Sequence, residues 1–212
     1  MGHRERRGGE LIVQIETVDR RLLAGIEETM AEAEHRSGGW LVCKVGCTQC
    51  CLGPFGITQL DAMRLRRGLE ELERAEPERA ARVRARAAEY VAAIAGEYPG
   101  DAMTGELQDE ERLPASMDDA SCPALDPESG RCDLYEARPV MCRTFGPVTK
   151  MGEDAFGACE LCYVGASDVE MRKCAVEVDA EGLERELLDV LESTGAKGMT
   201  IVAYALSAHG GG

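Results

Sequence analysis

The sequence CKVGCTQCC, residues 43–51, places four cysteines in the spacing C-x-x-x-C-x-x-C-C. Thiolates are soft ligands that select zinc, copper(I) or iron–sulfur clusters. Thiols this close together are more typical of a metal site than of a hydrophobic core. The chain contains ten cysteines, and we treat all of them as candidate metal ligands: Cys43, Cys47, Cys50, Cys51, Cys122, Cys132, Cys142, Cys159, Cys162 and Cys174.

The composition describes an acidic globular chain of 212 residues. This length suits one domain or two small ones, and we expect a single domain over residues 1–212. The formal net charge of −15 argues against non-specific nucleic-acid binding, which needs lysine and arginine to neutralise phosphates. It argues equally against binding to an anionic membrane surface. Only 4% of the residues are aromatic, so we expect metal ligation to supply part of the stability.

The first ten residues, MGHRERRGGE, are charged and lead into no long apolar run, so we expect no secretory signal. The longest apolar stretches are far too short to span a bilayer. The expected location is therefore the cytoplasm, where disulfides are rare, and the cysteines are expected to be metal ligands. In a secreted chain, the same cysteines would instead predict five disulfides.

Apolar residues recur at helical spacing in four stretches, which predicts a mainly α fold. The first stretch runs from about residue 10 to 36, and the last from about 180 to 193. Between them, Thr58 and Asp61 form a T-x-x-D sequence that is typical of a helix start. Pro77 suits the first turn of a further helix that continues to about residue 98.

The cysteines lie outside these helices, in two blocks. The first block occupies residues 40–56, a loop that contains several glycines, and the second occupies residues 122–174. Residues 99–121 lack clear periodicity and are expected to form a linker or loop. A short apolar element at residues 199–208 fits either a helix or a strand. We therefore expect a helical scaffold with two cysteine-rich, metal-organised loop regions.

Cys50 and Cys51 are adjacent, which limits how they can bind. Neighbouring side chains in an extended segment point to opposite faces, so these thiols more easily serve different metals, unless one of them bridges. The first block then needs ligands from the second, where Cys159-x-x-Cys162 has the spacing of a metal knuckle. Structural zinc takes four ligands and a four-iron cluster takes four thiolates. The cysteines thus suffice for two such sites, or for one larger polynuclear centre.

Two arginines flank Cys142 and are candidate cofactor-binding residues, namely Arg138 and Arg143. A guanidinium beside a thiolate lowers the pKa of the thiol and offsets the negative charge of a multi-thiolate site. The alternative for Arg138 is an ion pair with a nearby carboxylate such as Glu136.

Cys43, Cys47 and Cys50 also match C-x-x-x-C-x-x-C, which resembles the cluster-binding signature of radical S-adenosylmethionine enzymes. Those enzymes carry the motif on a βα barrel or a large part of one. This chain instead predicts long amphipathic helices around the motif and no series of βα units. The sequence context therefore disfavours this hypothesis.

A more specific resemblance involves both cysteine blocks. The first block continues into G-P-x-x-I-T at residues 53–58, and CPALDPESGRCDLYEARPVMCRTFG follows at residues 122–146. Together these sequences resemble the YkgJ-type cysteine-cluster family over roughly residues 40–165. That family is described as a zinc- or iron-chelating domain, so the resemblance implies metal chelation, and a flagellin lysine methylase shares this kind of cysteine arrangement. Cys159, Cys162 and Cys174 are not matched to ligands of the family.

These observations favour a protein that chelates zinc or iron, with an iron–sulfur cluster as one form of the iron, and with metal ions as its partners. The alternative is a metal- or iron–sulfur-dependent modifying enzyme with methylase-like or other redox chemistry, for which the sequence identifies no catalytic residue. A third hypothesis is a metal store or chaperone with exposed thiols. An open coordination position would favour catalysis, whereas a saturated site would favour structure or electron transfer.

Overall fold

The computed structural model describes residues 2–150 and 156–207, with side chains from residue 11 onward except that of Phe156. The chain forms two compact units. Unit 1 comprises Met1–Cys43 and Arg143–Thr194, and unit 2 comprises Lys44–Cys142 and Gly195–Gly212. The described residues confirm a mainly α fold with the cysteine blocks in loops and short elements. The single domain expected for the whole chain stays a prediction.

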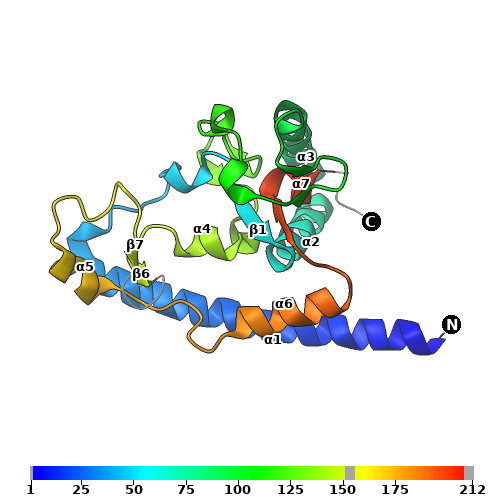
Figure 1. The fold of residues 1–212 in the computed structure, drawn as a ribbon, viewed down its shortest axis with the longest axis horizontal. Helices are drawn as coiled ribbons and strands as arrows, with labels where there is room; N and C mark the ends of the chain where they lie inside the picture. Colours follow the sequence, from blue (N-terminus) through cyan, green and yellow to red (C-terminus); the bar gives the residue numbers. More distant parts are fainter. Residues whose placement is uncertain (1, 151–155, 208–212) are drawn as a thin grey trace. The chain divides into compact units, whose positions relative to one another are not determined.

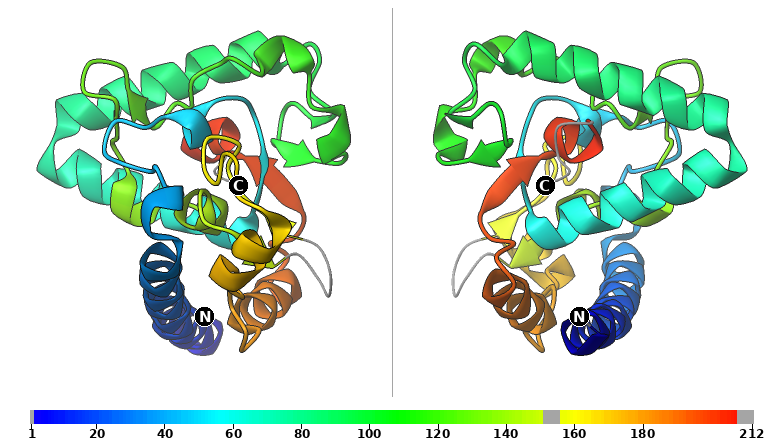
Figure 2. Two further views of the ribbon diagram at one scale, coloured as in Figure 1. Left: turned by 90° about the vertical axis from the view of Figure 1, so that its left-hand side faces the viewer. Right: turned by 90° about the vertical axis from the view of Figure 1, so that its right-hand side faces the viewer.

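Unit 1 is built on one long helix, α1 (Gly2–Ser37), which contains the helix expected at residues 10–36. Helix α6 (Leu183–Ser193) runs alongside α1, as Figures 1 and 2 show. α6 confirms the last predicted helix, and the Asp179 carboxylate accepts hydrogen bonds from its first two amides, each at 2.9 Å. Because these amides have no partner within the helix, Asp179 fixes where α6 begins.

The rest of unit 1 consists of short elements. Strands β6 (Thr149–Lys150) and β7 (Phe156–Gly157) form an antiparallel pair, and the 3-10 turn η1 covers Gly38–Trp40. Helix α5 (Asp168–Cys174) begins at a capping box formed by Ser167 and Glu170. The sequence analysis missed α5, because seven residues are too few to establish a helical period.

Unit 2 contains a layer of three helices: α2 (Gln59–Ala75), α3 (Pro77–Ile94) and α7 (Val202–Leu206). Both predicted helix starts are confirmed. The Thr58 hydroxyl accepts a hydrogen bond from the Asp61 amide at 3.2 Å, and Pro77 lies in the first turn of α3. The predicted apolar stripes form much of the core, which includes these fully buried residues: Leu65, Leu69, Val83, Ala87 and Ile94.

A four-stranded antiparallel sheet packs against these helices in the order β1-β8-β3-β2. The strands are β1 (Gly56–Thr58), β8 (Met199–Ile201), β3 (Glu106–Leu107) and β2 (Gly100–Asp101). The apolar element at 199–208 is therefore a strand followed by a helix, and its last residue lies outside the described part. Residues 99–121, expected as a linker or loop, contain β2, β3 and two 3-10 turns, η3 (Glu110–Arg112) and η4 (Ala115–Met117).

The cysteine blocks of unit 2 form short elements of their own. The turn η2 (Gln49–Cys51) carries the vicinal cysteines. Strands β4 (Leu125–Asp126) and β5 (Arg131–Cys132) form a hairpin, and the 3-10 turn η5 covers Tyr135–Ala137. Helix α4 (Val140–Thr144) begins directly after Pro139.

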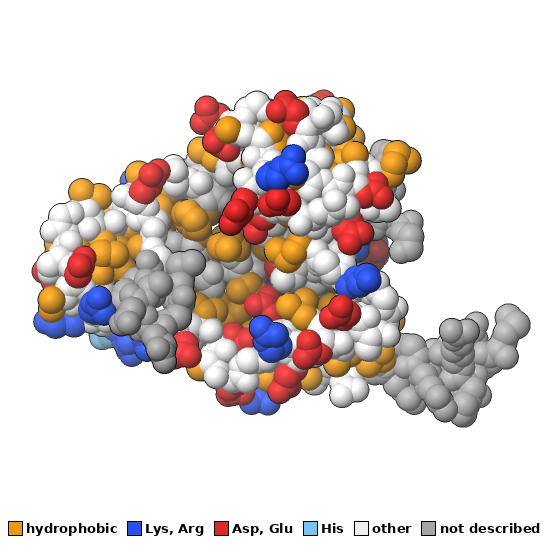
Figure 3. Space-filling model, in the orientation of Figure 1, with side chains coloured by type: hydrophobic (Ala, Val, Ile, Leu, Met, Phe, Trp, Pro, Cys, Tyr) orange, Lys and Arg blue, Asp and Glu red, His pale blue; other side chains and the backbone are white. Residues whose placement is uncertain are grey.

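The surface reflects the acidic composition. Figure 3 shows acidic side chains in several separate groups on the face in view, with basic side chains between them. Among the helices of residues 2–150 and 156–207, none is long and apolar enough to cross a membrane.

Candidate metal-binding sites

All ten cysteines are free thiols in the described part of the chain, and they divide between the two units. Unit 1 contains Cys43, Cys159, Cys162 and Cys174, and unit 2 contains the other six. The division falls inside the first cysteine block, between Cys43 and Cys47. The spacing of that block gave no sign of this division, because it depends on contacts with distant segments.

Backbone hydrogen bonds join the two cysteine blocks directly in unit 2. The Cys122 amide donates to the Cys51 carbonyl at 2.7 Å, and the Gly53 amide donates to the Ala120 carbonyl at 2.9 Å. Leu52 and Ser121 form an antiparallel bridge between these two bonds. The vicinal cysteines of η2 are thereby fixed beside the start of the second block.

The β4–β5 hairpin brings Cys132 close to Cys122. Cys132 pairs with Leu125 across the hairpin, and the Asp133 amide donates to the Ala124 carbonyl at 2.7 Å. The turn closes at Gly130, whose φ of +66° suits glycine because it has no Cβ. Cys122 and Cys132, ten residues apart in sequence, therefore both lie at the open end of the hairpin, away from its turn.

Two arginines of α3 hold this hairpin. The buried Asp133 carboxylate accepts hydrogen bonds from Arg79 Nε at 2.5 Å and from Arg86 Nη2 at 2.6 Å. Arg86 Nε also donates to the carbonyl of Pro123 at 2.8 Å. These contacts act next to both cysteines, because Asp133 follows Cys132 and Pro123 follows Cys122. Sequence reasoning treated α3 as plain scaffold and missed this network.

A second buried ion pair positions the helix that carries Cys142. The Asp61 carboxylate accepts a hydrogen bond from Arg64 at 2.5 Å, and both side chains are at most 5% exposed. The same Asp61 oxygen accepts a hydrogen bond from the Val140 amide at 3.0 Å. Asp61 thus satisfies the first amide of α4, two residues before Cys142. The T-x-x-D pattern identified Asp61 only as part of a helix start.

Five thiols of unit 2 are close enough to perturb one another electrostatically, and we call them the unit 2 thiol cluster: Cys50, Cys51, Cys122, Cys132 and Cys142. Burial raises the pKa of Cys122 to about 12. Burial likewise raises the pKa of Cys132 and that of Cys142, and neighbouring cysteines add to both shifts. Charged thiolates are therefore costly here without a compensating positive charge.

The vicinal thiols of Cys50 and Cys51 are hydrogen-bonded to each other. A hydrogen bond with Cys51 lowers the pKa of Cys50 to about 6, and the same hydrogen bond raises the pKa of Cys51. The pair therefore favours one thiolate that is stabilised by the neighbouring thiol. Cys47 belongs to the same unit, and its amide donates to the Lys44 carbonyl at 2.9 Å.

The two candidate arginines lie in different surroundings. The Arg138 guanidinium lies 3.5 Å from the centre of the exposed Tyr135 ring, and its positive charge opposes the upward shift that burial causes in the pKa of Cys132 and Cys142. Arg143 is only 6% exposed and forms an ion pair with Glu27 of α1 at 3.3 Å. Arg138 is thus within electrostatic range of the thiol cluster, as its predicted role requires.

Unit 1 gathers three cysteines, which we call the unit 1 thiol group: Cys43, Cys159 and Cys162. The sulfurs of Cys43 and Cys162 are 4.0 Å apart. The Cys159 amide donates to the Gly146 carbonyl at 3.2 Å, and the Cys162 amide donates to the Cys159 carbonyl at 2.9 Å, which closes the predicted C-x-x-C turn. Gly146 has φ +123°, and a Cβ there would lie 2.7 Å from the Cys43 sulfur. Only glycine fits this close approach.

Tyr163, which directly follows the C-x-x-C turn, anchors this group. Its amide donates to the Trp40 carbonyl at 3.0 Å. Its buried hydroxyl accepts a hydrogen bond from the Val148 amide at 3.3 Å and also contacts the Ser37 hydroxyl. Sequence reasoning missed Tyr163, whose φ of +57° is unusual for a residue with a side chain.

Cys174 is buried in the same hydrophobic cluster as Cys159 and Cys162. Its thiol donates a hydrogen bond to the Arg36 carbonyl at 3.4 Å. This contact gives the buried thiol a hydrogen-bond partner within the protein. This contact distinguishes Cys174 from the three cysteines of the unit 1 thiol group.

The donor chemistry of both groups fits zinc or iron, because clustered thiols are the ligands these metals take in cysteine sites. Tetrahedral zinc, with Zn–S distances of about 2.3 Å, separates neighbouring sulfurs by about 3.8 Å, close to the 4.0 Å between Cys43 and Cys162. In the described residues, no three Cys, His, Asp or Glu side chains converge closely enough to hold one ion as they stand. Ligation therefore requires thiol side chains to rotate about χ1.

Comparison with known proteins places this arrangement in a family. No curated protein and no solved structure matches the chain. A family model named CxxCxxCC, described as a "putative zinc- or iron-chelating domain", matches residues 42–162. The matched region covers more than half of the chain and contains every cysteine except Cys174. It confirms the resemblance found over residues 40–165, and the chain belongs to the CxxCxxCC family of zinc- or iron-chelating domains.

Proposed function

We propose that this protein chelates zinc or iron at two separate multi-thiolate sites, one in each unit. The observation that carries the proposal is the gathering of five thiols from three chain segments in the unit 2 thiol cluster. As thiolates, these groups would be costly to bury together unless a cation offset their charge. The surrounding ion pairs, Asp133 with two arginines and Asp61 with Arg64, hold these segments in place.

The unit 2 thiol cluster contains more thiols than one tetrahedral ion takes. The hydrogen bond between Cys50 and Cys51 favours a shared centre, in which one of them bridges, over two independent ions on opposite faces. Arg138 offsets part of the negative charge of such a centre. A polynuclear centre with bridging sulfur is the form of this site that we propose.

The unit 1 thiol group supports a second candidate function, a metal-dependent enzyme. It has three thiols, and the thiol of the remaining cysteine of this unit donates a hydrogen bond to the Arg36 carbonyl. Three protein ligands leave a fourth coordination position for water or substrate. Cys43 is the exposed member of the group, so the position beside it is accessible.

Anaerobic purification followed by metal analysis, acid-labile sulfide assay and visible absorption tests the proposal. We expect at least two metal equivalents per chain. A colourless protein with bound zinc would contradict an iron–sulfur centre, and a brown protein with labile sulfide would contradict a purely zinc form. A chain that takes up less than one equivalent of zinc or iron would contradict chelation itself.

Two single substitutions test the shared centre in unit 2. If Cys50 and Cys51 belong to one polynuclear centre, Cys50→Ser and Cys51→Ser should each remove all metal from unit 2. If each variant loses a different single equivalent instead, the vicinal cysteines serve separate ions. Cys174→Ser provides the control. Because Cys174 lies outside the matched region, this variant should retain the full metal content.

A further inference from the structure

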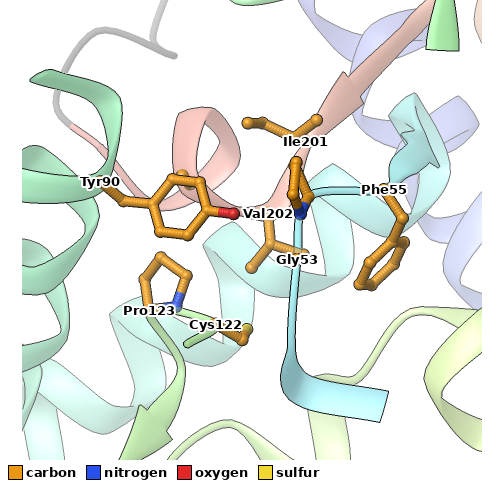
Figure 4. Close-up of a pocket in the computed structure, with 9 residues that line it drawn as sticks. Gly53, Phe55, Tyr90, Cys122, Pro123, Ile201 and Val202 are labelled. Carbon is orange, nitrogen blue, oxygen red and sulfur yellow. The ribbon is translucent and has the colours of Figure 1, made fainter. Parts of the chain in front are cut away.

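A small pocket in unit 2 lies beside the thiol cluster. Its volume is about 10 Å³, and it is lined by residues that include Gly53, Phe55, Tyr90, Cys122, Ile201 and Val202. A cavity of this size has room for about one water molecule. It is the place where α3, the start of the second cysteine block and the β8–α7 junction meet (Figure 4).

The Tyr90 hydroxyl points into this pocket, as Figure 4 shows. Tyr90 is 9% exposed, and its buried hydroxyl has no hydrogen-bond partner among the described residues. Buried hydroxyls are almost always paired with protein or with ordered water. An unpaired hydroxyl that faces a water-sized cavity therefore indicates a bound polar molecule.

Cys122 lines the same pocket as Tyr90 and is close enough to affect it electrostatically. Its amide donates to Cys51 and its carbonyl accepts from Leu125, so its backbone groups are already paired. Its sulfur accepts hydrogen bonds from the Ala124 and Leu125 backbone amides, and a cysteine sulfur has a lone pair left for one further donor. A water molecule between the two residues would accept from the Tyr90 hydroxyl and donate to the Cys122 sulfur.

We propose that Tyr90 is a positioning residue of the unit 2 thiol cluster, which acts on Cys122 through one buried water in this pocket. The inference rests on the proposed function in one respect, that Cys122 ligates metal. Hydrogen bonds to ligating atoms orient them and tune both the metal affinity and the reduction potential of a thiolate site. The bridge fixes the orientation of the Cys122 side chain.

The test uses Tyr90→Phe in the full-length protein, with Tyr204→Phe as the matched control. Tyr204 is a second tyrosine of unit 2 whose buried hydroxyl has no partner among the described residues. Its ring packs against Tyr98, and Asp101 is the charged group that affects it. Each variant deletes one buried tyrosine hydroxyl without a partner among the described residues. Of the two tyrosines, Tyr90 is the one that lines the pocket together with Cys122.

Metal-free protein is titrated anaerobically with Co²⁺, and the thiolate-to-cobalt charge-transfer band is followed in competition with a chelator. We expect Tyr90→Phe to weaken Co²⁺ binding about 10- to 100-fold and to shift this band, while Tyr204→Phe leaves both unchanged. Equal affinities and spectra for the two variants would overturn the role of Tyr90. Wild-type protein that takes up no Co²⁺ would overturn the proposed function together with this inference.

A second variant, Val202→Ile, tests the role of the water independently of the Tyr90 hydroxyl. Val202 lines the pocket, and the added methylene fills the space of the water while Tyr90 stays intact. We expect the same loss of Co²⁺ affinity as for Tyr90→Phe. Wild-type affinity in Val202→Ile would overturn the bridging water, even if Tyr90→Phe proved too unstable to titrate.

Discussion

The two thiol sites of this protein are built in different ways. In unit 2, charged side chains of the helices bind the cysteine segments, through Asp133 with Arg79 and Arg86. In unit 1, backbone geometry holds the thiols, because Gly146 lets the chain pass close to Cys43. The unit 2 thiol cluster therefore depends on charged side chains that are distant in sequence, whereas the unit 1 thiol group depends on one close backbone contact.

The largest expected effect comes from removing the carboxylate of the unit 2 network. Asp133→Ala leaves Arg79 and Arg86 without their shared partner, and losing one side of such a pair costs about 3 kcal/mol. We expect a lower free energy of unfolding in urea, together with loss of metal from unit 2. Glu73→Ala, which breaks the exposed Glu73–Arg84 pair, is the control and should cost less than about 1 kcal/mol.

The corresponding change in unit 1 is Gly146→Ala. The new Cβ would lie 2.7 Å from the Cys43 sulfur, and the strained backbone adds about 1–3 kcal/mol. Metal analysis should show loss of the unit 1 equivalent alone. Gly165→Ala carries a similar positive φ with no atom within 4 Å of the new Cβ, so it should retain its metal. Equal losses in both variants would attribute the effect to backbone strain alone.

Metal uptake by unit 2 should depend steeply on pH. Burial raises the pKa of Cys122 to about 12, so this thiol is protonated at neutral pH and must lose its proton to ligate. Affinity should therefore rise with pH, by about tenfold per pH unit for each proton released. Co²⁺ titrations at pH 6, 7 and 8 measure this slope, and a pH-independent affinity would exclude Cys122 as a ligand.

A smaller effect is expected at Tyr163, which supports the unit 1 thiol group. Tyr163→Phe removes the acceptor of the Val148 amide, so the free energy of unfolding should fall by about 1 kcal/mol. Tyr135→Phe, at an exposed ring, should leave stability unchanged in the same urea titration. If Tyr163→Phe were equally neutral, the hydroxyl would have no anchoring role.

Local signals in the sequence predicted much of the scaffold. The Thr58 cap, Pro77 and the apolar stripes of α2 and α3 depend on neighbours within a few turns, so the pattern alone identified them. Short elements such as α5 and the two-residue strands contain too few residues to show a period. The sequence therefore suggested a linker where β2 and β3 join the sheet.

The sequence could predict which residues are candidate ligands, but not which of them lie together or which other residues hold them in place. Spacing predicted the cysteines as ligands, and the family match supports the chelating class. The partners that arrange them are distant in sequence: Arg79 and Asp133 are 54 residues apart, and Cys43 and Cys162 are 119 apart. No local pattern links such pairs, so neither the division between Cys43 and Cys47 nor the role of Tyr90 could be inferred from the sequence.

The most direct test of two separable sites compares the metal content of two double variants, Cys43→Ser/Cys162→Ser in unit 1 and Cys122→Ser/Cys132→Ser in unit 2. The account predicts that each double variant loses the metal of its own unit and retains that of the other. Loss of all metal from both double variants would contradict it and would indicate one composite centre.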